Sequence, residues 1–458
     1  MKNVIVMLAS AVSACSLSAA PEIDSMRQSL TGDGVARVRY TLSGEPGVVT
    51  FSATYGDGTP VADSDMSNVS GQVNCLVHPG VSSSFSWKLP DSIVSVAKDV
   101  TVTLRVWATN CPPNYMVVCL TNVNNAVRYY TSIDRLPIPF GDMAYKTTHL
   151  VMSKIPAAGV VWRMGSPAYE VGRTSANEGT RRVVLTHDYY MGIYPVTVGQ
   201  FDFVKSITGH SVGSSAALTY LADDKVCAQD AAAPDWPRGQ LSYGNLRGTS
   251  ATADGKSWDQ KTPYWPNSGH EAIDSNSVLG LMRTKWGVSF DLPSEAEWEF
   301  ACRGGNSTAY YTGVDPNGPE GTSYLTNMAW MAINTSGAGT QGTVYKPHGV
   351  GQLKPNAFGL YDMLGGIWEY CADWQAPIVA SDALAIDPMG PANYSETADP
   401  NRAFSCGYRV LRGGSYATSA SSCRAAAQSR QAARFDAGTA PSKYSLGFRL
   451  WAPAMTEK

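Results

Sequence analysis

The sequence predicts two domains, an N-terminal all-β sandwich followed by a larger irregular α+β domain. Its 458 residues exceed what one hydrophobic core normally organises. Residues 34–135 contain short runs of alternating apolar and polar residues separated by turns, whereas later residues combine a few helix signals with long polar stretches. We expect a signal peptide at 1–20, the sandwich at 21–135, a linker at 136–150 and the second domain at 151–458.

The first 20 residues have the pattern of a secretory signal. Lys2 precedes an apolar run from Val4 to Ala14, which is shorter than the roughly 20 residues that span a bilayer. We therefore expect export, to the periplasm, the cell surface or the medium. The residues ending at Cys15 resemble a lipobox, which would place a lipid anchor on Cys15, and Ser18-Ala19-Ala20 offers an ordinary cleavage site, so both routes stay open.

Charge and hydropathy exclude two classes of partner. Lys and Arg number 35 against 38 Asp and Glu, giving a formal charge of -3, so nothing favours nucleic acid or an anionic membrane. Beyond the N-terminal run no segment is apolar enough to be a transmembrane helix.

The first domain is predicted from period-two patterns. Apolar residues alternate with polar ones over 36–42, 49–55 and 100–106, and turn residues follow at Ser43–Gly47 and Gly56–Pro60. Several such strands predict a sandwich of Ig or fibronectin type, acting as a spacer or interaction module. Two prolines within Arg135–Pro139 predict an extended linker.

Three helices are predicted in the second domain. Thr197–Gln200 and Ser294–Glu297 are capping boxes, and Ser275 is the expected N-cap of a helix that stops at Gly287. Glu295, Glu297 and Glu299 are attributed to capping and the helix dipole rather than to catalysis. The remaining stretches, 209–262 and 303–358, read as long loops.

Nine cysteines occur without the paired spacing of a zinc site. In an exported chain they predict disulfides. Cys111 and Cys119 are expected to flank a hairpin, and Cys423 is expected to pair with Cys302 or Cys371.

Six motifs occur in a fixed order in the second domain. They are Arg163–Ser166, Tyr189–Thr197, Leu292–Gly305, Pro355–Tyr370, Arg409–Tyr416 and Leu446–Arg449. Together they resemble the formylglycine-generating (sulfatase-modifying factor) family. The resemblance implies an irregular α+β fold related to C-type lectins, in which loops hold the ligands.

The resemblance implies a structural calcium ion in the segment Tyr361–Glu369. Its ligands would be the side chains of Asp362 and Glu369 and the backbone oxygens of Gly365 and Ile367. Oxygen donors with two carboxylates suit a hard cation. The alternative is that both acids merely flank a buried Trp368.

The family's catalytic cysteine pair is broken. Catalytic members bind copper(I) through two thiolates five positions apart after the Gly-Gly-Ser-Tyr motif, whereas here Thr418 occupies the first position and Cys423 the second. A register anchored on residues 432–434 still leaves one cysteine. Copper(I) requires soft sulfur ligands, so the sequence argues against a copper cofactor. Six scattered histidines offer no substitute metal site.

We therefore expect a catalytically silent or altered family member that binds an unidentified protein, peptide or glycan. Its cleft is predicted near Trp368, Ser415, Tyr416 and Arg434. The alternative is an oxidoreductase that makes formylglycine from peptidyl cysteine, or a related metal-dependent oxidase, with Cys423 as its candidate catalytic residue. A third hypothesis makes Tyr416–Ser445 a variable ligand-reading surface of lectin type.

Overall fold

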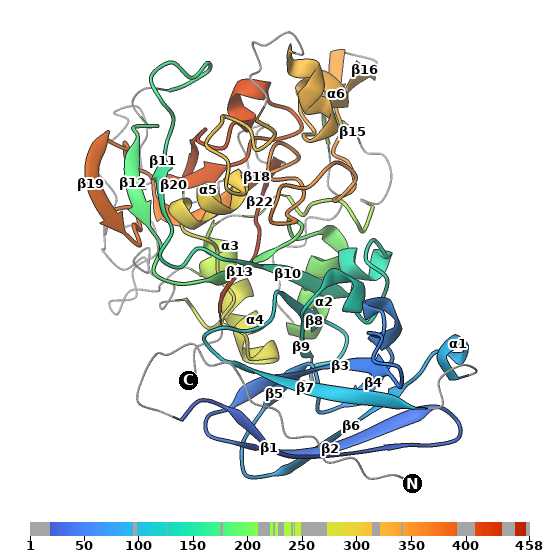
Figure 1. Cartoon of the computed structure of the whole chain (residues 1–458). Coiled ribbons are helices and arrows are strands. Elements are labelled where there is room, and N and C mark those ends of the chain that lie inside the picture. The colour runs from blue at the N-terminus through green and yellow to red at the C-terminus, as the bar shows by residue number, and fades with distance from the viewer. Residues whose placement is uncertain are drawn as a thin grey trace. The chain divides into compact units, whose positions relative to one another are not determined.

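Two compact units make up the chain in the computed structural model (Figure 1). One comprises Met1–Tyr145 with Ala454–Lys458, and the other comprises Lys146–Pro453. The residues described are 19–94, 99–124, 126–174, 177–208, 220–222, 225–227, 233–239, 241, 243–248, 273–313, 321–339, 342–391, 408–432 and 445–454. Strands outnumber helices in the described parts of both units, and each helix there is too short or too polar to cross a bilayer.

The first unit is built on two antiparallel sheets that share one core. One sheet has the order β1 (Glu22–Leu30), β2 (Val35–Ser43), β6 (Ser82–Lys88), β4 (Val69–Gly71), and the other has β5 (Cys75–Val77), β3 (Gly47–Tyr55), β7 (Val100–Ala108). Inward side chains of both sheets, such as Val38, Phe51 and Trp87, belong to the same buried cluster. The strands predicted at 36–42, 49–55 and 100–106 are confirmed.

The remaining elements of this unit are short. They are η1 (Asp63–Met66), α1 (Asp91–Val94), β8 (Tyr115–Cys119), β9 (Val127–Tyr130) and η2 (Ile133–Arg135), with η3 (Met143–Lys146) at the unit boundary. Arg135 is buried, donates from Nε to Asp63 at 2.8 Å and from Nη1 to the Phe51 carbonyl. The residue immediately before the predicted linker is therefore anchored to the first unit.

The prediction that Cys111 and Cys119 flank a hairpin is wrong. The hairpin is formed by β8 and β9, and Cys111 precedes it while Cys119 ends its first strand. Pro112 and Pro113 stand between Cys111 and β8. They have no N–H to donate to a ladder, so a strand cannot run from Cys111.

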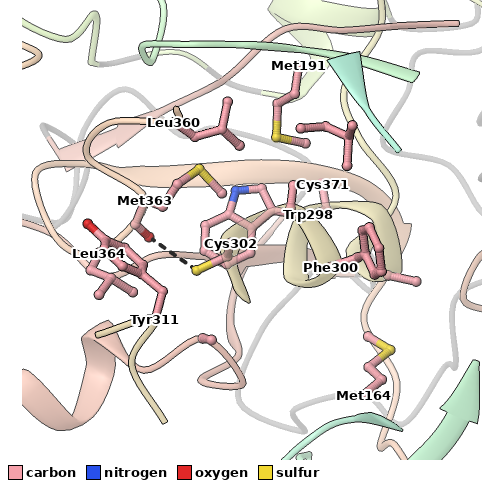
Figure 2. Packing of buried hydrophobic residues seen from close by; sticks show 14 of the residues in the cluster. Met164, Met191, Trp298, Phe300, Cys302, Tyr311, Leu360, Met363, Leu364 and Cys371 are labelled. Atoms are coloured by element: carbon pink, nitrogen blue, oxygen red, sulfur yellow. Dashed lines mark hydrogen bonds between the residues drawn. The ribbon is translucent and has the colours of Figure 1, made fainter. Parts of the chain in front are cut away.

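The second unit combines several small sheets. The first sheet includes, in spatial order, β23 (Trp451–Pro453), β13 (Tyr189–Gly192) and β10 (His149–Ile155), and the second has β11 (Val161–Met164), β12 (Arg181–Val184) and β19 (Ser381–Ile386). The third sheet has the order β15 (Lys225–Cys227), β14 (Tyr220–Ala222), β17 (Gly342–Tyr345), β16 (Ser336–Gly339). The fourth has the order β21 (Ser429–Ala432), β20 (Tyr408–Arg412), β18 (Trp368–Trp374), β22 (Leu446–Gly447). Their core includes Met191, Trp298 and Leu360 (Figure 2).

Short helices fill the rest of the second unit. They are α2 (Val198–Thr208), α3 (Tyr243–Arg247), α4 (Val278–Trp286), α5 (Glu295–Arg303), η4 (Gly321–Asn327), α6 (Ala332–Thr335) and η5 (Ala420–Cys423). Because η4, α6, β16 and β17 lie within 303–358, the expectation of one long loop there is wrong. Much of 209–262 lies outside the described residues.

The predicted capping boxes are confirmed. Thr197 and Gln200 exchange hydrogen bonds ahead of α2, and Ser294 and Glu297 do so at the start of α5. The N-cap expected at Ser275 is wrong, because the hydroxyl of Ser277 accepts from the Gly280 N–H. Gly287 ends α4 in the left-handed conformation, as expected.

Replacing Ser294 by alanine should lower the free energy of unfolding by about 1 kcal/mol, because the Glu297 N–H loses its acceptor at a buried helix terminus. Urea denaturation measures the change. Ser206→Ala removes an exposed hydroxyl from α2 and is the control, with an expected change below about 0.5 kcal/mol. An unchanged midpoint for Ser294→Ala would contradict the capping role.

Candidate functional site

Thr418 and Cys423 lie side by side in the second unit. Cys423 is fully buried at the end of η5, and Thr418 Oγ1 is 3.8 Å from its Sγ. The Ser415 N–H donates to Thr418 Oγ1 at 2.9 Å and fixes that side chain. Gly414 has φ +78°, and a Cβ there would stand 2.6 Å from Cys423 Sγ. A side chain at Gly414, the second glycine of the Gly-Gly-Ser-Tyr motif, would therefore clash with the sulfur of Cys423.

The environment of Cys423 does not favour a nucleophile. Burial raises the pKa of the thiol to about 12, and the hydrogen bonds from Thr418 and Ser415 lower it only in part. The thiol therefore stays protonated at neutral pH, whereas a catalytic cysteine reacts as thiolate. The donor set also fails to fit copper(I), because the neighbour of the single sulfur is a hard hydroxyl.

The predicted disulfide from Cys423 to Cys302 or Cys371 is wrong. All three thiols are free and buried in this structure. Cys302 lies on α5, with its Sγ 3.9 Å from the Met363 carbonyl, and Cys371 lies on β18 (Figure 2). Cys423 Sγ lies beside Gly414 and Thr418, and the three thiols belong to one buried cluster without being bonded to one another.

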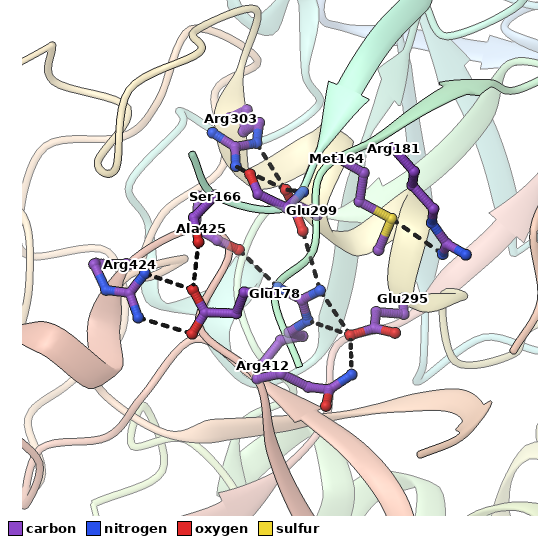
Figure 3. Close-up of polar contacts among 12 residues, drawn as sticks. Met164, Ser166, Glu178, Arg181, Glu295, Glu299, Arg303, Arg412, Arg424 and Ala425 are labelled. Carbon is purple, nitrogen blue, oxygen red and sulfur yellow. Dashed lines mark hydrogen bonds and ion pairs between the residues drawn. The ribbon is translucent and has the colours of Figure 1, made fainter. Parts of the chain in front are cut away.

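Arg424 anchors the segment that carries Cys423. This buried arginine pairs with Glu170 at 2.7 Å. It also pairs with Glu178 at 2.7 Å, and Glu178 accepts a hydrogen bond from the Ser166 hydroxyl (Figure 3). Ser166 ends the first of the six sequence motifs and Arg424 follows the fifth. The ion pairs therefore connect the segment that follows the fifth motif to the segment that follows the first.

A second set of ion pairs surrounds α5. Arg412 bridges Glu295 at 2.7 Å and Glu299 at 3.0 Å, and Glu299 also pairs with Arg303 at 2.7 Å (Figure 3). The attribution of the three acids to capping holds for Glu297, which completes the capping box. The attribution did not predict that Glu295 and Glu299 form buried ion pairs. Such pairs are needed because an unpaired charge is costly to bury.

The segment predicted to bind calcium fits only in part. Asp362 is buried with φ +57°, accepts the Gly351 N–H at 2.7 Å, and burial raises its pKa to about 6, as expected for a carboxylate short of positive charge. Glu369 is instead satisfied by Arg449 at 2.8 Å and by Trp298 Nε1 at 2.6 Å.

Arg449 therefore supplies a positive charge beside Glu369. Its guanidinium contacts both oxygens of that carboxylate and donates to the carbonyl groups of Gly192, Ile193 and Tyr361. The sequence placed Arg449 in the last motif without a role. Its position within an otherwise apolar run was the one feature of the sequence that indicated a buried, paired arginine. The carbonyl of Gly365, another predicted ligand, accepts the Ile367 N–H at 2.9 Å.

The predicted ligand cleft stays a prediction. Ser415 and Tyr416 are buried, and the Tyr416 N–H donates to the Gly366 carbonyl at 3.0 Å, which connects the cysteine segment to the calcium segment. Trp368 begins β18 and is half-buried. Arg434 lies outside the described residues, as does most of the proposed variable surface beyond residue 432.

Comparison with known families gives one decisive match. The family model described as "Sulfatase-modifying factor enzyme 1-like domain" matches residues 154–452, which is more than half of the chain. The chain belongs to this family. The resemblance predicted from six motifs is thereby confirmed.

Relatives of this sulfatase-modifying factor protein include both active and inactive members by name. It is 35% identical over 294 residues to the formylglycine-generating enzyme of Streptomyces coelicolor, covering 62% of this chain and 83% of that one. It is 25% identical over 236 residues to the inactive C-alpha-formylglycine-generating enzyme 2 of Mus musculus, covering 48% and 68%. A solved structure, Treponema denticola variable protein 1, shares 25% identity and a TM-score of 0.42 over 67% of this chain and 96% of that one.

Replacing Arg449 by methionine should lower the free energy of unfolding by about 3–5 kcal/mol, because Glu369 would be left as an unpaired buried charge. Denaturant unfolding measures the loss. The double variant Glu369→Gln with Arg449→Met should recover part of it, since the uncompensated charge is gone. Equal losses in the single and double variants would contradict the importance of this pair.

Proposed function

We propose that this protein is an exported, catalytically silent member of its family that acts as a binding module for a protein, peptide or glycan. The observation that carries the proposal is the pair of neighbouring side chains at the position of the family's copper clamp. The geometry of two adjacent ligand positions is kept, but one ligand is the hydroxyl of Thr418. The other, Cys423, is a buried and protonated thiol.

The scaffold around this position supports a role in binding. Gly414, Arg424 and Arg412 keep the loops in place through close packing and buried ion pairs, none of which depends on a metal. A mouse relative whose name describes it as inactive shows that such members exist under this family's name. Export to the periplasm, cell surface or medium remains part of the proposal, as does a possible lipid anchor at Cys15.

The second candidate function is formylglycine formation from peptidyl cysteine. The 35% identity to the Streptomyces coelicolor enzyme, over 83% of its length, is the observation that favours it. It requires a second sulfur beside Cys423. Beyond Cys15 of the predicted signal peptide, the cysteine side chains that the structure does not describe are those of Cys227 and Cys406, and these would be the sources to test.

Two fold relationships belong to the same proposal. The two-sheet architecture of the first unit supports its assignment as an Ig or fibronectin-type sandwich. The short strands and few helices of the second unit support the relationship to C-type lectins that the family resemblance implies.

Thr418→Cys tests the silent assignment. The wild-type protein, incubated with copper(I), oxygen and a peptide carrying a sulfatase-type cysteine motif, should leave the peptide unchanged in mass spectrometry. The variant should bind one copper(I) per chain, with an X-ray absorption spectrum of two sulfur ligands. The reason is that the side-chain atoms at positions 418 and 423 already lie 3.8 Å apart, close enough for one ion to contact both.

Thr418→Ser is the matched control and should bind no copper. Formylglycine produced by the wild-type protein would overturn the proposal of silence. Failure of a folded Thr418→Cys variant to bind copper would contradict the placement of Thr418 at the first ligand position. Thermal unfolding of each variant verifies that it is folded.

We also propose that calcium binds at Asp362 and the carbonyl groups of Gly365 and Ile367, with water completing the shell because Glu369 is engaged by Arg449. Millimolar calcium should raise the melting temperature of the wild-type protein by a few degrees, and this rise should vanish in Asp362→Asn. Magnesium is the control, since it demands tighter octahedral geometry. No calcium-dependent rise in the wild-type protein would refute this site.

A further inference from the structure

The outer face of the sheet β1-β2-β6 carries arginines that face one another. On each strand alternate residues point away from the core, and the central outward positions lie within 25–29, 37–41 and 82–86. Three are arginines, Arg27, Arg37 and Arg39, and the others are serine or threonine. We call this surface the basic face (strands in Figure 1).

The register brings the charges together. Arg27 on β1 is the direct cross-strand partner of Arg39 on β2, and Arg37 is the partner of Ser29 one row further. Arg39 and Arg37 are in turn opposite Ser84 and Ser86 on β6. Directly opposed residues on one face have Cβ atoms about 5 Å apart, so like charges there destabilise the sheet.

Acidic side chains do not neutralise this arrangement. Among the described residues, Arg27 and Arg39 form no ion pair, and the central outward positions contain no carboxylate. Glu22, an outward carboxylate of β1, lies at the strand end opposite Ser43. The nearby acids lie at the ends of the strands: Asp33 in the turn between β1 and β2 interacts with Arg37, and Asp24 accepts from the Ser43 hydroxyl. The centre of the basic face is therefore short of negative charge.

We propose that the basic face binds an acidic polysaccharide. The guanidinium groups of Arg27, Arg37 and Arg39 match carboxylate or sulfate groups through paired N–H donors. The hydroxyls around them, such as the pair formed by Ser25 and Thr41 at 2.8 Å, can exchange hydrogen bonds with sugar hydroxyls. An anionic glycan thus satisfies both parts of the surface.

Other anionic partners fit less well. The outward positions hold no aromatic side chain on which a base could stack, and three arginines neutralise few phosphates of a nucleic acid. They also hold no large apolar side chain to insert into a membrane. An acidic peptide would gain ion pairs but would leave most of the hydroxyls without a matched partner.

The experiment measures binding of the full-length protein to heparin, which carries sulfate, and to polygalacturonate, which carries only carboxylate, by isothermal titration calorimetry. Dextran is the neutral control. We expect binding to at least one acidic glycan, weakened by added salt, and none to dextran. Arg27→Ser with Arg39→Ser should weaken it at least ten-fold.

The second unit offers a matched control. Arg163 on β11 is the cross-strand partner of Arg182 on β12, and Arg163 pairs with Asp382 at 3.2 Å. Arg163→Ser with Arg182→Ser therefore removes the same charge from an opposed arginine pair elsewhere and should leave glycan binding unchanged. In the absence of glycan, the Arg27/Arg39 variant should melt at the same or a higher temperature than the wild-type protein, because a like-charge contact has been removed.

Three results would overturn the proposal. One is the absence of binding to both acidic glycans. Another is an equal loss of binding in the two double variants, which would indicate only a general charge effect. The third is tighter binding to poly-glutamate or to vesicles containing phosphatidylserine than to either glycan, which would assign the basic face to a peptide or a membrane.

Discussion

Buried pairing of arginine with carboxylate is the interaction on which the second unit depends. Arg412 connects β20 to α5 through Glu295 and Glu299, Arg424 connects the cysteine segment to Glu178, and Arg449 holds Glu369. A fold with small sheets and short helices buries less apolar surface per element than a large sheet does. Paired charges specify which loops meet, because each unpaired charge would be too costly to bury.

This mode of stabilisation makes the scaffold independent of the side chain at position 418. The ion pairs and the close approach of Gly414 to Cys423 would persist whether position 418 held a sulfur or an oxygen. In the proposed function, a hydroxyl in place of one thiolate disfavours copper(I), while the ion pairs that position the loops are unchanged.

In contrast to the second unit, the first unit is stabilised mainly by its apolar core. Its core is regular, with Val38, Phe51 and Trp87 in one cluster, so the two sheets do not need charged residues to hold together. Yet the outer face opposes Arg27 to Arg39 where serine would have been less repulsive. This like-charge contact is the basis for our proposal that the basic face binds an acidic glycan.

The sequence by itself determined three strands of the first unit, the two capping boxes and the family, because these follow from local alternation, local hydrogen bonding and ordered motifs. It also determined that the cysteine segment contains a single sulfur. Only the tertiary structure decided that Ser277 rather than Ser275 caps α4, that the three buried cysteines are free and that Arg449 occupies Glu369. Each of these depends on which side chains from distant parts of the sequence lie in contact in the folded protein. Spacing along the chain does not determine those contacts.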